Sequence, residues 1–331
     1  MAQTIRQATI EDIPQLVDLL LLDAKERHSA DPVLWKLADD ASAQIEKALT
    51  FALTAMQQPF QQIWQVAEDD GEIHGVIHSM LLPVPPIYAG LKGDPGLILP
   101  DSFVSSNAPE GTVMTLLDAA ENALIYAGAK IIISSFVVGD LWREAFETRN
   151  YEPLTHYMSR TNFGDQAMPA CLRKATKEDV SGIVARSAEN REVLYSIDPF
   201  WATHSDADMR FAGWMTHCLT YQDRDMIVMG NPDALEGYII AQPATRLHFP
   251  PAHDISGNGV VDDYYHPELA DTIRLTRDGE GATDLLRAAE AAFANRGIRA
   301  NFVVCAAGWL SKIDLLEAAG YDRAMVWSIK R

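Results

Sequence analysis

The chain contains the same pattern twice. Three blocks of the first half recur in the second half in the same order, with matched residues 167 to 170 positions apart. The pairs are IRQATIEDIPQLV (5–17) with LRKATKEDVSGIV (172–184), LLDAAENALIYAG (116–128) with LLRAAEAAFANRG (285–297), and FETRNYEPLTHYMSR (146–160) with LLEAAGYDRAMVWSIKR (315–331). Self-similarity at a fixed spacing is typical of a repeated structural unit. The sequence therefore predicts two copies of one fold, residues 1–162 and 170–331, joined by a linker at 163–169.

Each copy mixes strand and helix signals in the same order. A short strand precedes a helix whose start carries Thr9 as N-cap and Asp12 in the first turn, and Thr176 and Asp179 repeat this arrangement. A hairpin, a strand, a glycine-containing loop, a helix, an apolar strand, a helix and a closing strand follow. We therefore expect an α/β (α+β) fold in each copy, with a mixed, mostly antiparallel sheet flanked by helices.

Composition limits the classes of partner. The formal net charge is −19 and 48% of the residues are hydrophobic, so the chain can build real cores and its field repels nucleic-acid phosphates. The three cysteines, Cys171, Cys218 and Cys305, form neither a metal pattern nor a disulfide framework. We expect no signal peptide, because the first 26 residues place acids ahead of the leucines, and no apolar run approaches the roughly 18 residues that a membrane span needs. We expect a cytoplasmic protein that binds neither nucleic acid nor membrane.

One stretch of the second copy, Val260 to Gly297, has the pattern of an anion site. It reads as a buried strand from Val260 to Tyr265, a loop carrying Arg277, Gly279 and Gly281, and a helix from about Ala282. Glycines let the backbone approach a ligand, and a helix N-terminus offers unsatisfied N–H groups with a partial positive charge. This arrangement is how a chain presents main-chain donors to a phosphate, although most G-x-G pairs are plain turns.

The strand before that loop carries two adjacent acids, Asp262 and Asp263. Strand alternation would place them on opposite faces of the sheet. A carboxylate inside an apolar strand has a raised pKa and is a candidate general base. Alternatively, both acids lie at the strand edge and bond to loop N–H groups. His266 is a second candidate base, although a turn residue is the commoner role. Without a second cluster of ligands at metal spacing, we expect no metal.

Several segments together resemble the GCN5-related N-acetyltransferase superfamily, as a tandem pair. They are the opening I-R-x-A-T-x-E-D-I, the hairpin AEDDGEIHGVI (67–77), DDYYHPEL before the glycine loop, and the G-Y or N-Y that precedes the last strand of each copy. The resemblance covers nearly all of both copies. It implies two acyl-CoA N-acyltransferase folds, each able to bind acetyl-CoA between splayed central strands.

The resemblance also implies roles for particular residues. The family's phosphate loop, Q/R-x-x-G-x-G/A, is matched in the second copy with a one-residue offset, and the first copy keeps only one of its glycines. The implied cofactor-binding residues are Tyr264, Tyr265, Arg277, Gly279, Gly281, Ala282 and Thr283, with Gly111 and Thr112 in the first copy. The tyrosine that often serves as acid in this family is replaced by Phe146 and Leu316. The usual acid is therefore missing from both copies.

The sequence supports two functions. The first is an N-acyltransferase that moves an acetyl group from acetyl-CoA to a small amine, with Asp262, Asp263 or His266 taking the proton. The second is a non-catalytic acyl-CoA sensor or scaffold, suggested by the missing tyrosine and the eroded first loop. Residues 82–99 are a lid or a plain surface loop, and Trp35 and the segment 195–201 line an acceptor pocket or anchor helices. The acceptor and the oligomeric state stay open, a homodimer included.

Overall fold

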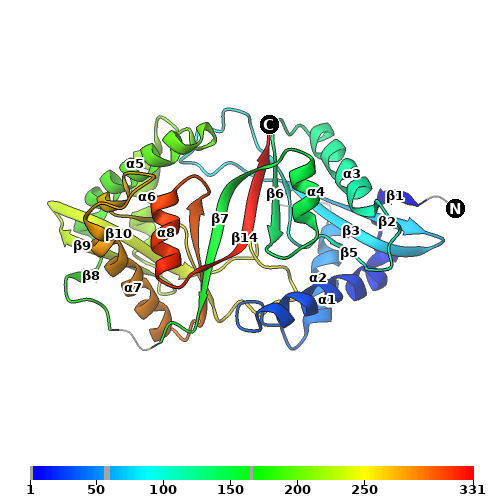
Figure 1. Cartoon of the computed structure of the whole chain (residues 1–331), viewed down its shortest axis with the longest axis horizontal. Helices are drawn as coiled ribbons and strands as arrows, with labels where there is room; N and C mark the ends of the chain where they lie inside the picture. Colours follow the sequence, from blue (N-terminus) through cyan, green and yellow to red (C-terminus); the bar gives the residue numbers. More distant parts are fainter. Residues whose placement is uncertain (1–2, 56–59, 165–166) are drawn as a thin grey trace.

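The structure is a computed structural model that describes residues 3–55, 60–164 and 167–331, so residues 165 and 166 of the predicted linker lie outside it. A single sheet of 14 strands runs through the described part of the chain, and helices cover both of its ends (Figure 1). The order of strands along the sheet is β1-β2-β3-β4-β6-β14-β7-β13-β11-β10-β9-β8, with β5 and β12 beside β3 and β10.

The elements follow the same order in both halves. The first half contains β1 (Thr4–Gln7), η1 (Ile10–Asp12), α1 (Ile13–Ala30), α2 (Ala41–Thr54), β2 (Gln62–Asp69), β3 (Glu72–Leu81), β4 (Gly96–Ile98), β5 (Phe103–Val104), α3 (Thr112–Tyr126), β6 (Ile132–Val137), α4 (Trp142–Thr148) and β7 (Glu152–Thr161). The second half contains β8 (Leu172–Lys174), η2 (Lys177–Asp179), α5 (Val180–Ile197), η3 (Pro199–Trp201), α6 (Ala207–Cys218), β9 (Asp225–Asn231), β10 (Ala234–Pro243), β11 (Asn258–Val261), β12 (Tyr264–Tyr265), η4 (Pro267–Leu269), η5 (Arg277–Gly279), α7 (Glu280–Asn295), β13 (Ala300–Ala306), α8 (Leu310–Ala318) and β14 (Asp322–Lys330).

The predicted helix starts are confirmed in both halves as capping boxes. The Asp12 carboxylate accepts a hydrogen bond from the Thr9 backbone N–H at 2.7 Å. It also accepts hydrogen bonds from both terminal nitrogens of Arg6, at 2.7 and 2.8 Å. Asp179 repeats this arrangement with Arg173, and the charge-assisted bonds lower its pKa to about 2. A bidentate Arg–Asp pair thus ties each first strand to the start of its helix.

A glycine in the third strand of each half lets the covering helix come close. A Cβ on Gly75 would lie 2.9 Å from Leu116 of α3, and a Cβ on Gly237 would lie 2.8 Å from Leu285 of α7. Both leucines are fully buried, and burial of such a side chain contributes about 1.5–3 kcal/mol. The matched glycine–leucine contacts place α3 and α7 identically on their parts of the sheet.

The last strands of the two halves are exchanged. β7, from the first half, pairs antiparallel with β13 of the second half, and β14 pairs antiparallel with β6 of the first half. β7 and β14 also pair with each other at the centre of the molecule (Figure 1). The sequence predicts a closing strand at the end of each copy but does not reveal this exchange. The division into units 1–162 and 170–331 stays a prediction.

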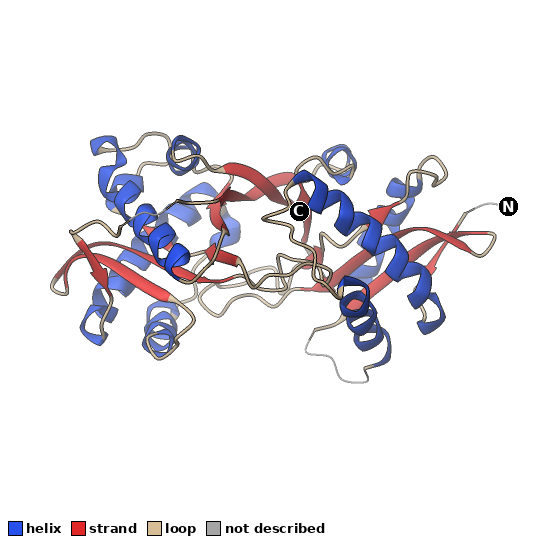
Figure 2. Cartoon of the chain, turned by 90° about the horizontal axis from the view of Figure 1, so that it is seen from below, coloured by secondary structure: helices blue, strands red, loops and turns tan. Residues whose placement is uncertain are grey.

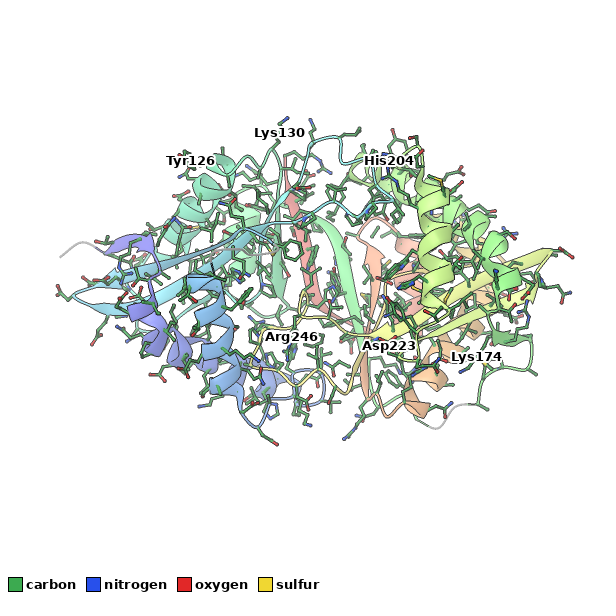
Figure 3. The ribbon with its side chains drawn as sticks, turned by 180° about the vertical axis from the view of Figure 1, so that it is seen from behind. Tyr126, Lys130, Lys174, His204, Asp223 and Arg246 are labelled. Atoms are coloured by element: carbon green, nitrogen blue, oxygen red, sulfur yellow. The ribbon has the colours of Figure 1, made fainter. Side chains whose placement is uncertain are left out.

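Loops cross between the halves on one side of the central strands (Figure 2). Residues 82–95 of the first half reach the second half, where Tyr88 bridges to Thr203 and the Ala89 N–H donates to Ala202 O at 2.7 Å. The opposite crossing joins His253 of the second half to Leu37. His204 and Arg246 mark the two crossings in Figure 3. The segment considered as a lid thus contacts the second half in this structure.

An aromatic cluster fills the space under these loops. Trp35 packs on Phe249 with ring centroids 5.1 Å apart, and Phe249 packs on Phe302 at the same distance. Tyr157 of β7 and Trp327 of β14 extend the cluster at 5.4 Å from each other. Large buried aromatic contacts between halves favour one fixed arrangement of both. Trp35 therefore serves here as a packing anchor.

Candidate functional site

The two adjacent acids, Asp262 and Asp263, lie where the second half's central strand is broken. Between the pairs Ile239–Tyr264 and Gln242–Val260, two residues of β10 face three residues, 261–263, of the partner strand. One extra residue in a strand produces a bulge and ends the alternation of side chains. The continuous strand predicted over 260–265 was therefore wrong: it is divided into β11 and β12, and the acids occupy the break.

Neutral side chains donate the side-chain hydrogen bonds that both carboxylates accept. The Asp263 carboxylate accepts a short hydrogen bond from the Tyr238 hydroxyl and a 3.4 Å contact from Asn190 Nδ2. Asp262 accepts from Gln242 Nε2 at 2.9 Å. Within the described part of the chain neither acid has an ion-pair partner. Sequence reasoning missed Tyr238 and Asn190, which lie 25 and 73 positions from Asp263.

Burial governs the protonation of this pair. Burial raises the pKa of Asp263 to about 7, and the hydrogen bond from Tyr238 and the charges of Lys312 and Arg191 only moderate this effect. The Asp262 residue is exposed to solvent. The protein atoms packed around its carboxyl group nevertheless raise the pKa of that group by partial desolvation. A carboxyl group that titrates near neutral pH can accept a proton from an ammonium group, or hold that cation in its ionised form.

The central strands diverge next to these acids. β11 and β13 pair in parallel from Asn258–Ala300 to Val261–Val303, after which β12 stays with β10 and β13 continues beside β7. The buried Lys312 of α8 lies at the divergence, where its Nζ donates to Tyr264 O at 3.0 Å. Burial lowers the pKa of Lys312. The splayed strands expected from the resemblance are present, with a lysine at their opening.

The predicted phosphate loop ends in the expected helix, which begins at Glu280 rather than near Ala282. Arg277, Asp278 and Gly279 all have positive φ, at 51°, 58° and 69°. Such a conformation is uncommon for non-glycine residues and costs energy that the surrounding structure must supply. Arg277 is exposed. Gly281 and Thr283 lie in the first turn of α7 and are half-buried.

A carboxylate of the chain itself occupies the start of α7. The Ala282 N–H donates to Glu268 Oε2 at 3.1 Å, and a Cβ on Gly281 would lie 2.6 Å from His266 Nε2. His266 Nδ1 accepts from the Glu268 N–H at 3.3 Å and caps η4. His266 therefore contacts the loop and α7, and the structure does not bring it to the two acids. The Glu268 carboxylate thus occupies the position at this helix N-terminus where a phosphate group would bind.

Tyr264 and Tyr265 are fully buried. The Tyr264 hydroxyl donates to Ala282 O, so this ring joins the broken strand to α7. Burial raises the pKa of Tyr265 to about 12. Because both rings belong to the core, Tyr264 and Tyr265 can contact a ligand between the diverging strands only through their backbone groups.

The first half has a similar site with different contents. Gly111 precedes α3 with φ 83°, and among the described residues, its chain neighbours aside, nothing lies within 4 Å of the position its Cβ would take. Thr112 is buried, and its hydroxyl donates to Pro109 O at 2.6 Å. Phe146 and Leu316, at the positions of the missing tyrosine, are buried core residues. In the described part of the chain, no cluster of three or more potential metal ligands occurs and no helix could span a membrane.

No protein-family model matches this sequence, and no curated protein matches it either. Solved structures match over 99% of the chain. A GCN5-related N-acetyltransferase from Sphaerobacter thermophilus has a TM-score of 0.56 at 13% identity, with 95% of that chain covered. A tandem GNAT protein from the clavulanic acid biosynthesis pathway has a TM-score of 0.53 at 12% identity, with 98% of it covered.

A third match is a GCN5-related glucosamine N-acetyltransferase region of a fungal multi-domain β-N-acetylglucosaminidase, with a TM-score of 0.53 at 14% identity and 38% of that chain covered. Identities this low establish the fold alone. The fold predicted from the sequence is confirmed: the chain has the GCN5-related N-acetyltransferase fold, built as a tandem pair.

Proposed function

We propose that the chain is an acyl-CoA-dependent N-acyltransferase that acts on the amine of a small molecule, with the reaction in its second half. One observation carries the proposal. Asp263 lies beside the divergence of the central strands, its hydrogen-bond donors among the described residues are neutral, and its pKa is raised to about 7 by burial. The fold supports acyl transfer as the class of reaction.

The residues at the start of α7 fit the diphosphate of an acyl-CoA. Glu268 already places an anion on the Ala282 N–H, so the position accepts negative charge once that carboxylate moves away. The proposed holders are the backbone N–H groups of Gly281, Ala282 and Thr283, with Arg277 exposed beside them. When bound, the acyl-CoA supplies an activated acyl group as a thioester.

Asp263 prepares the amine. An amine arrives mostly as an ammonium ion, which the two carboxylates attract. Asp263 in its ionised form then takes one proton from the nitrogen and leaves the neutral amine, which is the nucleophile that acyl transfer requires. The Tyr238 hydroxyl holds the Asp263 carboxylate in place during this step. His266, engaged at η4 and α7, is not part of this proposal.

A second function, acyl-CoA sensing without catalysis, is favoured by a specific observation. A side chain of the chain itself donates to the strand carbonyl at the divergence in both halves: Lys312 to Tyr264 O at 3.0 Å, and Trp142 Nε1 to Ser102 O at 2.8 Å. With Phe146 and Leu316 in the core, the described structure offers no tyrosine at the usual acid position. A chain without this acid would bind acyl-CoA and signal its presence without transferring the acyl group.

Two measurements on the purified full chain test the proposal. Calorimetry with acetyl-CoA should show binding, and release of free thiol from acetyl-CoA should depend on an added amine. Asp263→Asn should abolish most of the thiol release while acetyl-CoA binding persists. Binding without amine-dependent release from a broad amine panel would support the sensor, and no binding at all would exclude both functions.

A further inference from the structure

Lys312 is a buried cation that the reaction proposed above does not use. The residue is 3% exposed, and its ammonium group has no ion-pair partner in the part of the chain that the structure describes. Lysine is almost never fully buried unless it is paired, because an unpaired ammonium ion is costly to remove from water. A buried lysine without a charged partner therefore points to a function that offsets this cost.

A carbonyl and two aromatic rings hold the ammonium group in place. Lys312 Nζ donates to Tyr264 O at 3.0 Å and lies 4.8 Å from the ring centroids of both Tyr264 and Trp309. The Trp309 ring is fixed in turn, because its Nε1 donates to Leu269 O at 2.9 Å. Aromatic faces attract a cation. An ammonium group has three N–H donors, and the Tyr264 carbonyl uses one of them, so the other donors are available to an anion.

This ammonium group lies where the central strands separate. Tyr264 belongs to β12, which stays with β10, whereas β13 continues beside β7. Asp263, the proposed base, is the residue before Tyr264. Besides burial, which lowers the pKa of Lys312, the charges of Cys305 and Asp263 act on it. Burial raises the pKa of the Cys305 thiol to about 12, so Asp263 is the anion of the two near neutral pH.

The first half has a neutral group at the equivalent point. Trp142 of α4 lies 170 positions before Lys312, the shift of the closing blocks, and its Nε1 donates to Ser102 O at 2.8 Å. The strand carbonyl at the divergence is therefore satisfied in that half without a charge. The hydrogen bond to the strand explains a donor at this position, but it does not explain a buried positive charge.

Acyl transfer from a thioester creates a negative charge that such a cation can stabilise. The amine nitrogen forms its bond to the acyl carbon and loses one proton to Asp263, while the carbon–sulfur bond breaks and its electron pair stays on sulfur. An ammonium group beside the sulfur stabilises this charge and supplies the proton that converts the thiolate to a thiol. Lys312 is then neutral, and it regains a proton as Asp263 releases one, so the protons balance.

We propose that Lys312 is the catalytic acid of the second half, where it contacts the sulfur of the acyl-CoA and protonates the departing thiolate. The proposal rests on the N-acyltransferase function and assigns a further residue to the same site. It also accounts for the apolar residue at the usual tyrosine position, because Leu316 lies one turn after Lys312 in α8. The same helix thus supplies an acid from a different position.

Titration of bound CoA tests the contact with sulfur without any turnover. The ultraviolet absorbance of the thiolate reports the pKa of the CoA thiol on the purified full chain, with desulfo-CoA, which lacks the sulfur, as the blank. A cation beside the sulfur should lower this pKa by about 1 to 3 relative to free CoA. Lys312→Met should abolish that lowering, whereas Lys177→Met, at an exposed lysine of η2, should retain it. An identical thiol pKa in the wild type and Lys312→Met would overturn the proposal.

Turnover and stability separate a catalytic lysine from a structural one. Lys312→Met should lower kcat for amine-dependent thiol release by about 10²-fold or more. Its affinity for acetyl-CoA should stay within a few-fold, because the sulfur of the intact thioester carries no charge. Its urea midpoint should equal or exceed that of the wild type, because an apolar side chain replaces an unpaired buried charge. A lower midpoint with an unchanged kcat would show that Lys312 is structural and would overturn the proposal.

Failure of this proposal differs from failure of the N-acyltransferase function. If the wild type releases no thiol in the presence of amines, the enzyme function fails, and the role of Lys312 as an acid fails with it. If the wild type does release thiol and Lys312→Met releases it with the same kcat, the enzyme function stands and the role of Lys312 alone is refuted.

Discussion

The two halves place a carboxylate at the same point of the same broken strand and surround it differently. Asp101 lies two residues before Phe103, which pairs with Val76, the residue after Gly75. Asp263 lies two residues before Tyr265, which pairs with Tyr238, the residue after Gly237. Asp101 is paired with His78 Nδ1 at 2.8 Å. In the part of the chain that the structure describes, the side chains that donate to Asp263 are neutral. The shared scaffold fixes where the acid stands, and its neighbours decide whether it serves structure or remains available to a ligand.

The helices that face the broken strands show the same contrast. Trp142 of α4 and Lys312 of α8 donate to equivalent strand carbonyls, one as a neutral indole and the other as a buried amine. At the neighbouring helix N-termini, the space beside Gly111 is open, whereas Glu268 caps Ala282. The first half thus has the open helix start and an acid that is hydrogen-bonded to His78. The second half has the available acid and a self-capped helix start.

The sharpest test of this contrast is a matched pair of substitutions. Asp263→Asn should lower kcat/KM for amine acylation by about 10²-fold or more, because loss of a general base typically costs 10²–10⁴. Asp101→Asn should leave kcat/KM within a few-fold, since that carboxylate is occupied by His78. The measurement is amine-dependent thiol release. If the two substitutions had equal effects, the assignment of chemistry to the second half would be wrong.

Stability should show the opposite order. Asp101→Ala leaves His78 Nδ1 without its hydrogen-bond partner in a buried site, where an unsatisfied polar group costs about 1–3 kcal/mol. Asp263→Ala should cost clearly less, because it removes a carboxylate whose charged form burial already disfavours. Urea unfolding at pH 7 measures both. An equal loss of unfolding free energy would mean that Asp263 is as structural as Asp101.

Local features of this fold could be predicted from the sequence because neighbours in the chain determine them. Thr9 and Asp12 cap a helix three residues apart. The N-Y and G-Y pairs noted in the sequence place Asn150 and Gly320 in left-handed turns, each before a buried tyrosine. The exchange of β7 and β14 could not be predicted in this way. Two copies with the same strand pattern offer each last strand two equivalent partners, and only the assembled sheet distinguishes them.

The candidate site was predictable only in part for the same reason. Asp262 and Asp263 could be recognised from the sequence because they are charged residues within an apolar run. The bulge that holds them could not, because it depends on how β10 pairs with β11 and β12. Lys312 reaches Tyr264 from 48 positions away, and Glu268 reaches Ala282 across 14. The signal that could have identified Lys312 is its alignment with Trp142 at the 170-residue shift of the closing blocks.

Removal of the internal anion tests the difference between the helix starts. Glu268→Ala should tighten acetyl-CoA binding by about three- to tenfold, because an anion at a helix N-terminus is worth roughly 0.3–1 kcal/mol, and up to about 2 in partly buried sites. Glu317→Ala, at an exposed acid of α8, is the control for the change in net charge. Calorimetry gives both affinities. If Glu268→Ala matched the control, acetyl-CoA would bind away from α7, with the open start of α3 as the next position to test.

The pH dependence of the reaction should show the smallest effect and report on Asp263 itself. Its pKa is raised to about 7, and only the ionised form accepts a proton, so activity should rise with pH through that value. For a single group titrating at pH 7, kcat/KM should increase about twofold from pH 7 to pH 8 and fall about fivefold from pH 7 to pH 6. A base with an ordinary aspartate pKa near 3.8 would give a flat profile over this range. Because the pH profile of kcat/KM reports groups of the free enzyme, a flat profile would show that no base titrating near pH 7 takes part.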